Sequence, residues 1–402
     1  MLDHLRRSGR ASRTGLSAAT GLSRATISAI VTDLLQRGAV VVVPTPEDDQ
    51  PRVGRTPESL ALDPSSGLLL GVDLGHTRVR AVVVDAAHDV VASGAREYPA
   101  GSPWGDRLRV AVPLADELLA GASPSGLLRG VGVGVTGSTP AAARLGEEVR
   151  CALADRYGVA GRAGNNARLA GLAEVVWGAA RGASDALYVR LSTGVGGAVV
   201  LDGRVRSGPT GSAGELGHVC LDPDGPLCRC GGRGCLEALV GLPVVLGAAG
   251  AADVDALRRA LDGGDPAARE AVRRAAARTA VALAGAVTVM DVPLVVVGGE
   301  LADVGEHLLG PLRKELAKHV LASSVEAVSV RPAALGELGG ALGGVALLLH
   351  DPDVELVSPG PSSPGPSSPG SSSPGPAPRG ARAAAARGPD RPTAPALAAP
   401  RS

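Results

Sequence analysis

Two segments near the start of the chain have the spacing of amphipathic helices. A serine precedes each segment, at Ser12 and Ser23, where its hydroxyl can accept a hydrogen bond from the first turn of a helix. We therefore expect helices over 13–19 and 24–37. In the second helix the apolar positions follow the i, i+3, i+4, i+7, i+8 rule, which predicts one buried face. These positions are Ile27, Ile30, Val31, Leu34 and Leu35.

Two short segments that can form strands follow, at 40–43 and 59–62, and can pair around a loop rich in proline and aspartate. Helix, tight turn, helix and β-hairpin is the order of a winged helix-turn-helix. We therefore predict a DNA-binding domain over 1–62, and the chain opens within what should be its first helix. The alternative is an ordinary helical module with solvated arginines.

Sequence-specific contacts are expected at the start of the second helix, the end that reads base edges in helix-turn-helix proteins. Two arginines of the wing loop can reach phosphate or the minor groove. The predicted DNA-binding residues are Ser23, Arg24, Ala25, Thr26, Ser28, Arg52 and Arg55. Because one such module is too small to be selective, we expect a homodimer or homotetramer on double-stranded operator DNA.

From Leu68 onward β-branched segments alternate with helical ones, which predicts an α/β fold with mostly buried sheets. Glycine-rich turns at 71–77 and 192–197 recur in similar strand–turn–strand settings, which suggests two related lobes around a cleft. The expected strands are 68–72, 79–84, 131–135, 186–191, 198–201 and 294–297. The expected helices are 107–120, 147–157, 166–179, 254–261, 265–290 and 304–320.

The last segment, 358–402, consists almost entirely of Pro, Gly, Ser, Ala and Arg. It has too little apolar surface to form a core, so we predict a disordered tail.

Charge supports a local interaction with nucleic acid rather than a global one. The 402 residues carry 40 Lys and Arg against 40 Asp and Glu, so the net charge is zero. Between residues 1 and 45, however, six arginines stand against two aspartates, a local net charge of +4. Such an imbalance fits contact with DNA phosphates at one end of the chain.

Five cysteines, four of them within 220–235, argue for a reducing compartment rather than a disulfide framework. No charged-then-apolar leader opens the chain, and Asp291 and Pro293 interrupt the apolar stretch 282–297. We expect a cytoplasmic protein that does not associate with membranes.

Four metal-binding side chains lie close together in the sequence: His218, Cys228, Cys230 and Cys235. Three thiolates and one imidazole suit a tetrahedral zinc ion, and a closed site of four protein ligands is structural. Glu215 and Glu237 flank the segment and are free to hold polar hydroxyls. The alternative is a metal knuckle that only fixes a loop.

The pattern E-x-G-H followed by C-x-C-G-x-x-G-C-x-E resembles the signature of the ROK family of sugar-responsive repressors and sugar kinases. The resemblance implies that the metal is zinc, and that Asn165, Glu215, His218 and Glu237 bind a sugar or sugar phosphate. It also implies a two-lobed, actin-like ATPase fold over 66–352. Lobe 1 would comprise about 66–165 with 338–352, and lobe 2 about 166–337.

The resemblance extends to the loops that bind ATP phosphates in family kinases. Glycine lets backbone approach phosphate, a hydroxyl bonds it, and a carboxylate holds the metal. The first loop corresponds to D-x-G-x-T at 73–77 and the second to 192–197, and 297–300 resembles the adenosine turn. The residues carried over are Asp73, Gly75, Thr77, Thr193, Gly194 and Gly196.

Two departures weigh against kinase activity. The family motif N-D-x-N reads Asn165-Asn166-Ala167-Arg168 here, and an amide at Asn166 cannot act as general base. The segment 141–146 is also expected to be a shortened loop over the sugar. The leading hypothesis is therefore a repressor that is not an enzyme. The alternatives are an ATP-dependent sugar kinase with an added DNA-binding module, and a regulator that has lost sugar sensing.

Overall fold

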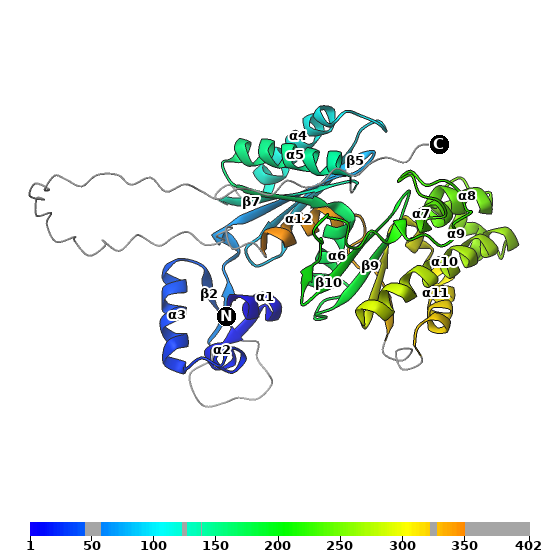
Figure 1. The fold of residues 1–402 in the computed structure, drawn as a ribbon. Helices are drawn as coiled ribbons and strands as arrows, with labels where there is room; N and C mark the ends of the chain where they lie inside the picture. Colours follow the sequence, from blue (N-terminus) through cyan, green and yellow to red (C-terminus); the bar gives the residue numbers. More distant parts are fainter. Residues whose placement is uncertain (45–57, 123–126, 138, 322–327, 350–402) are drawn as a thin grey trace, which may run out of the picture. The chain divides into compact units, whose positions relative to one another are not determined.

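The computed structural model describes residues 1–44, 58–122, 127–137, 139–321 and 328–349 (Figure 1). The predicted tail at 358–402 and the wing-loop residues Arg52 and Arg55 lie outside the described residues. The α/β class predicted from the sequence is confirmed. The predicted domain limits stay predictions.

The N-terminal region contains helices and an antiparallel sheet of order β1-β3-β2. Both predicted caps are present: Oγ of Ser12 accepts a hydrogen bond from Gly15 N at 3.0 Å, and Oγ of Ser23 accepts one from Thr26 N at 3.1 Å. The elements are α1 (Leu2–Ser8), β1 (Arg10–Ser12), α2 (Arg13–Thr20), α3 (Arg24–Gln36), β2 (Val40–Pro44) and β3 (Glu58–Leu62).

One apolar core joins these elements. The predicted inner face of α3 is buried at Ile27 and Val31, which pack with Leu5 of α1, Leu16 of α2 and Leu60 of β3. Burial of each such side chain stabilises the fold by about 1.5–3 kcal/mol.

A second sheet has the order β6-β5-β4-β7-β8, and a short η1 (Pro64–Ser66) precedes it. Alternate residues of its strands point to opposite faces, as the period of two requires. Helices α4 and α5 cover one face, and α12 with α6 covers the other (Figure 1). The elements are β4 (Leu68–Leu74), β5 (Arg78–Asp85), β6 (Val90–Glu97), α4 (Trp104–Ala122), β7 (Leu128–Val135), α5 (Pro140–Tyr157) and β8 (Ala160–Asn165).

A third sheet has the order β11-β10-β9-β12-β13. Helix α6 packs on one of its faces, and α7 to α11 contribute to the core on the other. Its elements are α6 (Asn166–Val176), β9 (Ala186–Leu191), β10 (Val195–Leu201), β11 (Arg204–Val205), α7 (Leu236–Val240), α8 (Leu242–Ala249), α9 (Val254–Asp262), α10 (Pro266–Met290), β12 (Leu294–Gly298), α11 (Glu306–His319) and β13 (Ser329–Pro332).

Helix α12 (Gly339–Leu349) contacts both α6 and the second sheet, and η5 (Gly336–Leu338) leads into it. Two strand glycines make this contact possible. A Cβ at Gly71 would lie 2.1 Å from the carbonyl oxygen of Ala341, and one at Gly132 would lie 2.0 Å from that of Gly344. The helix therefore packs backbone to backbone on the sheet.

The expectation of a loop over 141–146 is wrong, because α5 begins at Pro140 and this segment forms its first turns. The start is locally determined. Thr139 accepts a hydrogen bond from Ala142 N at 3.2 Å, and a proline in the first turn lacks an N–H that would have no partner there. Gly146 lies inside this helix, where a Cβ would approach Val135 to 3.0 Å.

Candidate functional site

The four predicted metal ligands come together in one cluster. His218 ends η2 (Leu216–His218), Cys228 and Cys230 lie on a tight turn, and Cys235 directly precedes α7. Their ligand atoms all lie within 4.8 Å of one another. The turn is closed by hydrogen bonds from Cys228 N to Gly232 O at 2.8 Å and from Gly231 N to Cys228 O at 2.9 Å.

The spacing of the donor atoms fits a tetrahedral metal ion. A Zn–S bond of about 2.3 Å in a tetrahedron places two sulfurs about 3.8 Å apart. The Sγ atoms of Cys230 and Cys235 are 3.7 Å apart, and Cys228 Sγ lies 3.7 Å from Nδ1 of His218. Two of the donor spacings therefore match a tetrahedral metal site, and all four donor atoms lie close enough together to share one ion.

A cavity of about 300 Å³ opens next to this cluster. Its walls come from the turn after β4, the end of β7, the start of α6, the β9–β10 turn, η2 and the turn over 228–232, here called the cysteine turn. Of the predicted site residues, the following line it: Gly75, Thr77, Asn165, Thr193, Gly194, Gly196, Glu215 and His218. Asp73 and Glu237 lie behind the wall, where each contacts a residue of the lining.

Asn165 and Asn166 occupy the junction of β8 and α6. Oδ1 of Asn165 accepts from Arg168 N at 3.0 Å as helix cap, and its Nδ2 donates to Gly137 O at 3.0 Å. Nδ2 of the buried Asn166 donates to Oδ1 of Asp73 at 3.0 Å. Asn166 thus supplies a proton donor, not an acceptor, to the neighbouring carboxylate.

Asp73 is itself almost fully buried, at 1% exposure. Burial raises the pKa of its carboxyl, while the positive charge of Arg190 and the hydrogen bond from Asn166 act in the opposite direction.

Both carboxylates expected to hold sugar hydroxyls have an arginine partner. Nη2 of Arg168 lies 3.5 Å from Oε1 of Glu215. Arg229 binds Glu237 through two contacts, Nε to Oε1 at 2.6 Å and Nη2 to Oε2 at 2.7 Å. Oε2 of Glu237 also accepts from Val195 N at 2.9 Å. Glu237 therefore ties the cysteine turn to the β9–β10 turn.

The first glycine turn is anchored from outside the cavity. The carbonyl of Gly75 accepts from the hydroxyl of Tyr98 at 2.6 Å and from Nη1 of Arg107 at 2.9 Å. Arg107 also stacks over the ring of Trp104, with its Cζ 4.5 Å from the centroid. Burial raises the pKa of Tyr98 to about 12, so its hydroxyl remains a donor.

The second turn requires a glycine for close approach. A Cβ at Gly194 would lie 2.8 Å from both Nη2 of Arg229 and Oε2 of Glu237. Ser192 N donates to Gly194 O at 3.0 Å, and Leu242 N donates to Ser192 O at 2.8 Å, which fixes the turn to the start of α8.

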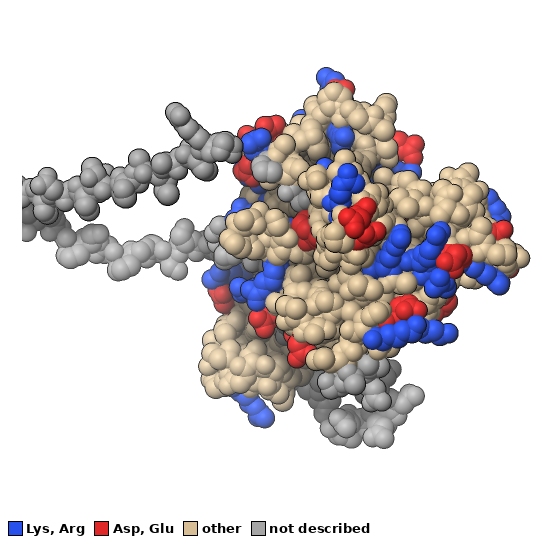
Figure 2. Space-filling view, turned by 45° about the vertical axis from the view of Figure 1, so that its right-hand side comes forward, with Lys and Arg blue, Asp and Glu red and all other residues tan. Residues whose placement is uncertain are grey.

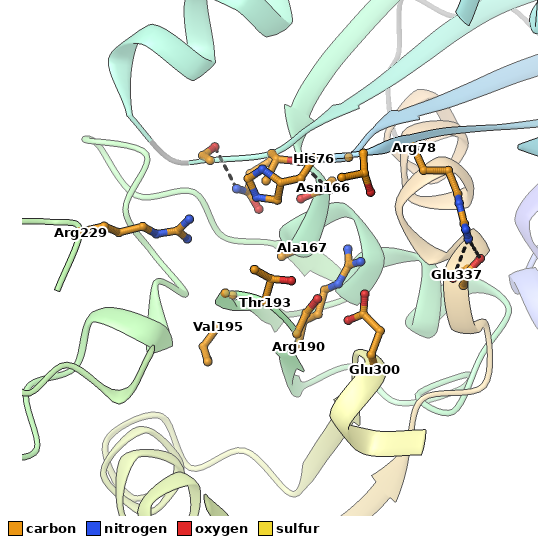
Figure 3. A pocket seen from close by; sticks show the side chains of 18 of the residues that line it. His76, Arg78, Asn166, Ala167, Arg190, Thr193, Val195, Arg229, Glu300 and Glu337 are labelled. Carbon is orange, nitrogen blue, oxygen red and sulfur yellow. Dashed lines mark hydrogen bonds and ion pairs between the residues drawn. The ribbon is translucent and has the colours of Figure 1, made fainter. Parts of the chain in front are cut away.

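Sequence reasoning missed the charged residues that line much of the cavity. Arg78 and Arg80 both contact Glu337, with Arg80 Nη2 3.0 Å from Oε1. Figure 3 shows the pair formed by Arg78 and Glu337. The other missed charged or titratable lining residues are His76, Arg190, Arg229 and Glu300. Each of these four residues lies inside a quoted motif or within two residues of one. Charged residues in or beside the motifs were therefore the available signal for them.

The predicted DNA-reading residues Ser23, Arg24, Ala25, Thr26 and Ser28 are all exposed at the start of α3. At the other end of this helix Arg37 pairs with Asp33, with Nε 2.9 Å from Oδ1. On the face of the molecule shown in Figure 2, positive and negative side chains are interspersed, in keeping with the zero net charge.

None of the described helices alone is long and apolar enough to cross a bilayer. The bent pair Leu236–Ala249 and Val254–Asp262 reaches that length and apolarity only when its two helices are taken together.

Comparison with known proteins places this site in context. The ROK family model matches residues 69–351. A glucokinase of Thermotoga maritima is 33% identical over 203 residues, which cover 46% of this chain and 64% of that relative. A putative xylose repressor of Caldicellulosiruptor sp. is 25% identical over 358 residues, covering 82% of this chain and 89% of the repressor. The structure of a ROK hexokinase from Thermus thermophilus superposes with a TM-score of 0.58 at 31% identity, covering 69% of this chain and 97% of the hexokinase.

Proposed function

The chain belongs to the ROK family, and from that premise we propose that it is a DNA-binding transcriptional regulator, a repressor whose family domain binds a sugar or sugar phosphate without phosphorylating it. It would act in the cytoplasm as a homodimer or homotetramer on operator DNA.

The observation that carries this proposal is Asn166. It stands where the family motif has the carboxylate that takes the proton from the sugar, and an amide offers no titratable lone pair. Its Nδ2 is moreover engaged with Asp73 at 3.0 Å. Loss of a positioned base lowers a rate by about 10²–10⁴.

The N-terminal elements are the second support. The match to the hexokinase structure spans 97% of the hexokinase and 69% of this chain. The alignment with the putative xylose repressor spans 82% of this chain. The described helices α2 and α3, with the exposed start of α3, have the order of a helix-turn-helix.

The metal cluster is proposed to hold a structural zinc ion. Three thiolates and one imidazole leave no open coordination position for chemistry. The ion would fix the turn that carries Arg229, and with it the wall of the cavity.

A sugar kinase is the second candidate function, because glucokinases are among the relatives and Gly75 and Thr77 of the first phosphate loop line the cavity. Sugar-dependent release of ADP by the purified chain separates the two. We expect none above the rate without sugar; turnover typical of a sugar kinase would overturn the proposal.

A regulator without sugar sensing is a further possibility, and thermal melting addresses it. A sugar or sugar phosphate that raises the melting temperature supports an effector site. No shift across a panel of both classes would favour a regulator that has lost its effector.

A further inference from the structure

Three nitrogen-bearing side chains converge on the cavity from different elements (Figure 3). Arg190 comes from the end of β9, Arg229 from the cysteine turn, and His76 from the turn between β4 and β5. Thr193 lies between the two arginines in the same view. Arg190 lies outside the motifs of the sequence comparison, and Arg229 occupies a variable position between Cys228 and Cys230.

Arg229 retains capacity to donate. Its guanidinium has five N–H groups, and the contacts with Glu237 use Nε and one N–H of Nη2. The side chain is 58% exposed and lines the cavity, so the remaining N–H groups are available there. The pairing with Glu237 holds the planar group in one orientation, which lowers the entropy lost when an anion binds.

Arg190 is the more unusual of the two. It is partly buried, and its guanidinium forms no hydrogen bond or ion pair within the described part of the chain. The carboxylates of Asp73 and Glu300 favour its protonated form without bonding it directly. Oε2 of Glu300 is buried and lacks a hydrogen-bond partner among the described residues. An arginine and a carboxylate with unused hydrogen-bonding capacity thus both line the cavity.

His76 adds a donor that remains neutral near pH 7. Burial lowers the pKa of its imidazole, and the positive charges of Arg229, Arg107 and Arg190 lower it further. The same arginines thus set a positive potential at this end of the cavity.

The residues expected to hold neutral hydroxyls are, by contrast, already engaged. Glu215 faces Arg168 and Glu237 is bound by Arg229. Asn165 uses Oδ1 as a helix cap and one Nδ2 proton on Gly137. Hydroxyl binding by these groups competes with existing partners, whereas an anion meets arginines that still have free N–H groups.

We propose that the effector is an acidic sugar, carrying a phosphate or a carboxylate, whose anionic group binds between Arg190 and Arg229 and whose adjacent hydroxyl bonds Glu300. This inference rests on the proposed regulatory function and specifies its ligand class. Arg190 supplies a fixed positive charge that interacts with Asp73, the carboxylate that would otherwise hold a metal ion. Binding of the anion therefore needs no divalent cation. Charge-assisted hydrogen bonds of this kind are about twice as strong as neutral ones.

The test is a matched ligand series on the full chain. Calorimetry and thermal melting are run with glucose, glucose 6-phosphate and glucuronate, and with the corresponding sets for galactose, mannose and xylose, in the presence and absence of Mg²⁺. We expect an acidic member of a set to bind more tightly than its neutral parent by about tenfold or more, equally well without Mg²⁺. The phosphate and carboxylate arms identify which acid the site takes.

Variants assign the effect to the two arginines. Arg190→Gln and Arg229→Gln should each weaken the acidic ligand by about ten- to a hundredfold. Arg190→Lys keeps the charge and should recover part of the loss. Arg204→Gln on β11, an exposed arginine that does not line the cavity, is the matched control and should change nothing.

Several outcomes overturn the inference. They are tighter binding of a neutral sugar than of its acidic counterparts, acidic binding unaffected by Arg190→Gln and Arg229→Gln, and no binding by any acidic member at millimolar concentration. A mobility shift on operator DNA with the same samples keeps the two claims apart. Specific DNA binding released by a neutral sugar contradicts only the ligand class, whereas failure to bind operator DNA specifically contradicts the proposed function itself.

Discussion

At the scale of single residues, the pairing of Asn166 with Asp73 bears on both the proposed absence of kinase activity and the stability of the cavity wall. The two side chains are buried and 3.0 Å apart. An ionised aspartate at position 166 would face Asp73 as a like charge, and the two could share only one proton. The amide removes this conflict by donating a hydrogen bond.

Asn166→Asp is therefore expected to give at most trace phosphorylation and to lower the free energy of unfolding by about 1–3 kcal/mol, since a buried hydrogen bond is replaced by repulsion. Sugar-dependent ADP release and chemical denaturation measure the two effects. Asn165 is not changed in this variant, so the N-terminal cap of α6 stays in place. A variant with full kinase activity and unaltered stability would show that the wild-type arrangement is not what prevents catalysis.

His76 provides a pH test. The pKa of its imidazole in the folded chain lies below the ordinary value of 6.5, chiefly because of burial and then because of Arg229, Arg107 and Arg190. On unfolding it regains the ordinary value, so protons favour the unfolded chain. Its contribution to stability is complete above pH 6.5 and is lost as the pH falls below 6.5 toward the folded pKa.

His76→Gln should reduce the loss of unfolding free energy between about pH 7.5 and about pH 5.5, measured by chemical denaturation. Because every other titratable group is the same in both proteins, comparing wild type with variant isolates His76. A variant with the same or a steeper pH dependence would contradict the assignment.

At the scale of structural elements, the cysteine turn joins the metal cluster to the cavity. Arg229 lies between two ligands, Cys228 and Cys230, and reaches Glu237, which accepts from Val195 N. Loss of the metal should therefore loosen the β9–β10 turn as well as the cluster.

We expect one zinc ion per chain by metal analysis, and Cys230→Ser should lower the free energy of unfolding by on the order of 4 kcal/mol, because binding energy of a structural zinc is folding energy. Cys220→Ser is the control: its Sγ lies outside the cluster and donates to Arg233 O, which a hydroxyl can also do. Zinc-free protein from unchelated purification would refute the assignment, as would equal stability of the two variants.

The exposed start of α3 is the element that should read DNA. Arg24→Ala is expected to weaken specific binding by about 1–3 kcal/mol if Arg24 pairs with a guanine. Arg37→Ala, at the far end of the helix, removes only the exposed pair with Asp33, a loss of about 0.3–0.5 kcal/mol in stability. Equal effects of the two changes on specific binding would place the reading surface elsewhere.

The sequence predicted elements whose signals are local and missed those set by tertiary contact. The caps at Ser12 and Ser23 and the apolar face of α3 follow from neighbouring residues. Helix α12 was missed because glycines dominate its first turns; it forms there because Gly71 and Gly132 allow its backbone to approach the sheet.

In the candidate site, too, the sequence predicted the features with local signals and missed the contacts between distant segments. The four candidate metal ligands lie within eighteen residues of one another, and the sequence correctly predicted that their donor atoms cluster. The contact of Arg168 with Glu215 spans 47 positions, and that of Arg80 with Glu337 spans 257. Such pairs depend on how the sheets and α6 bring distant segments together, which spacing in the sequence does not encode.

At the scale of the whole molecule, the proposed regulator combines DNA recognition with a cavity that binds a sugar ligand without phosphorylating it. A single DNA-reading module buries too little surface for selectivity, so the working species should be a dimer on an inverted repeat. Zero net charge over the chain makes nonspecific attraction to DNA weak, which favours discrimination between operator and other sequences.

The most direct measurement of this claim is the affinity of the full chain for the region upstream of its own gene, compared with random DNA of equal length by mobility shift at fixed salt. The account predicts binding to the upstream region tighter by about 10³-fold or more, weakened by the effector. Equal affinity for both DNAs, by folded protein with and without sugars, would contradict it.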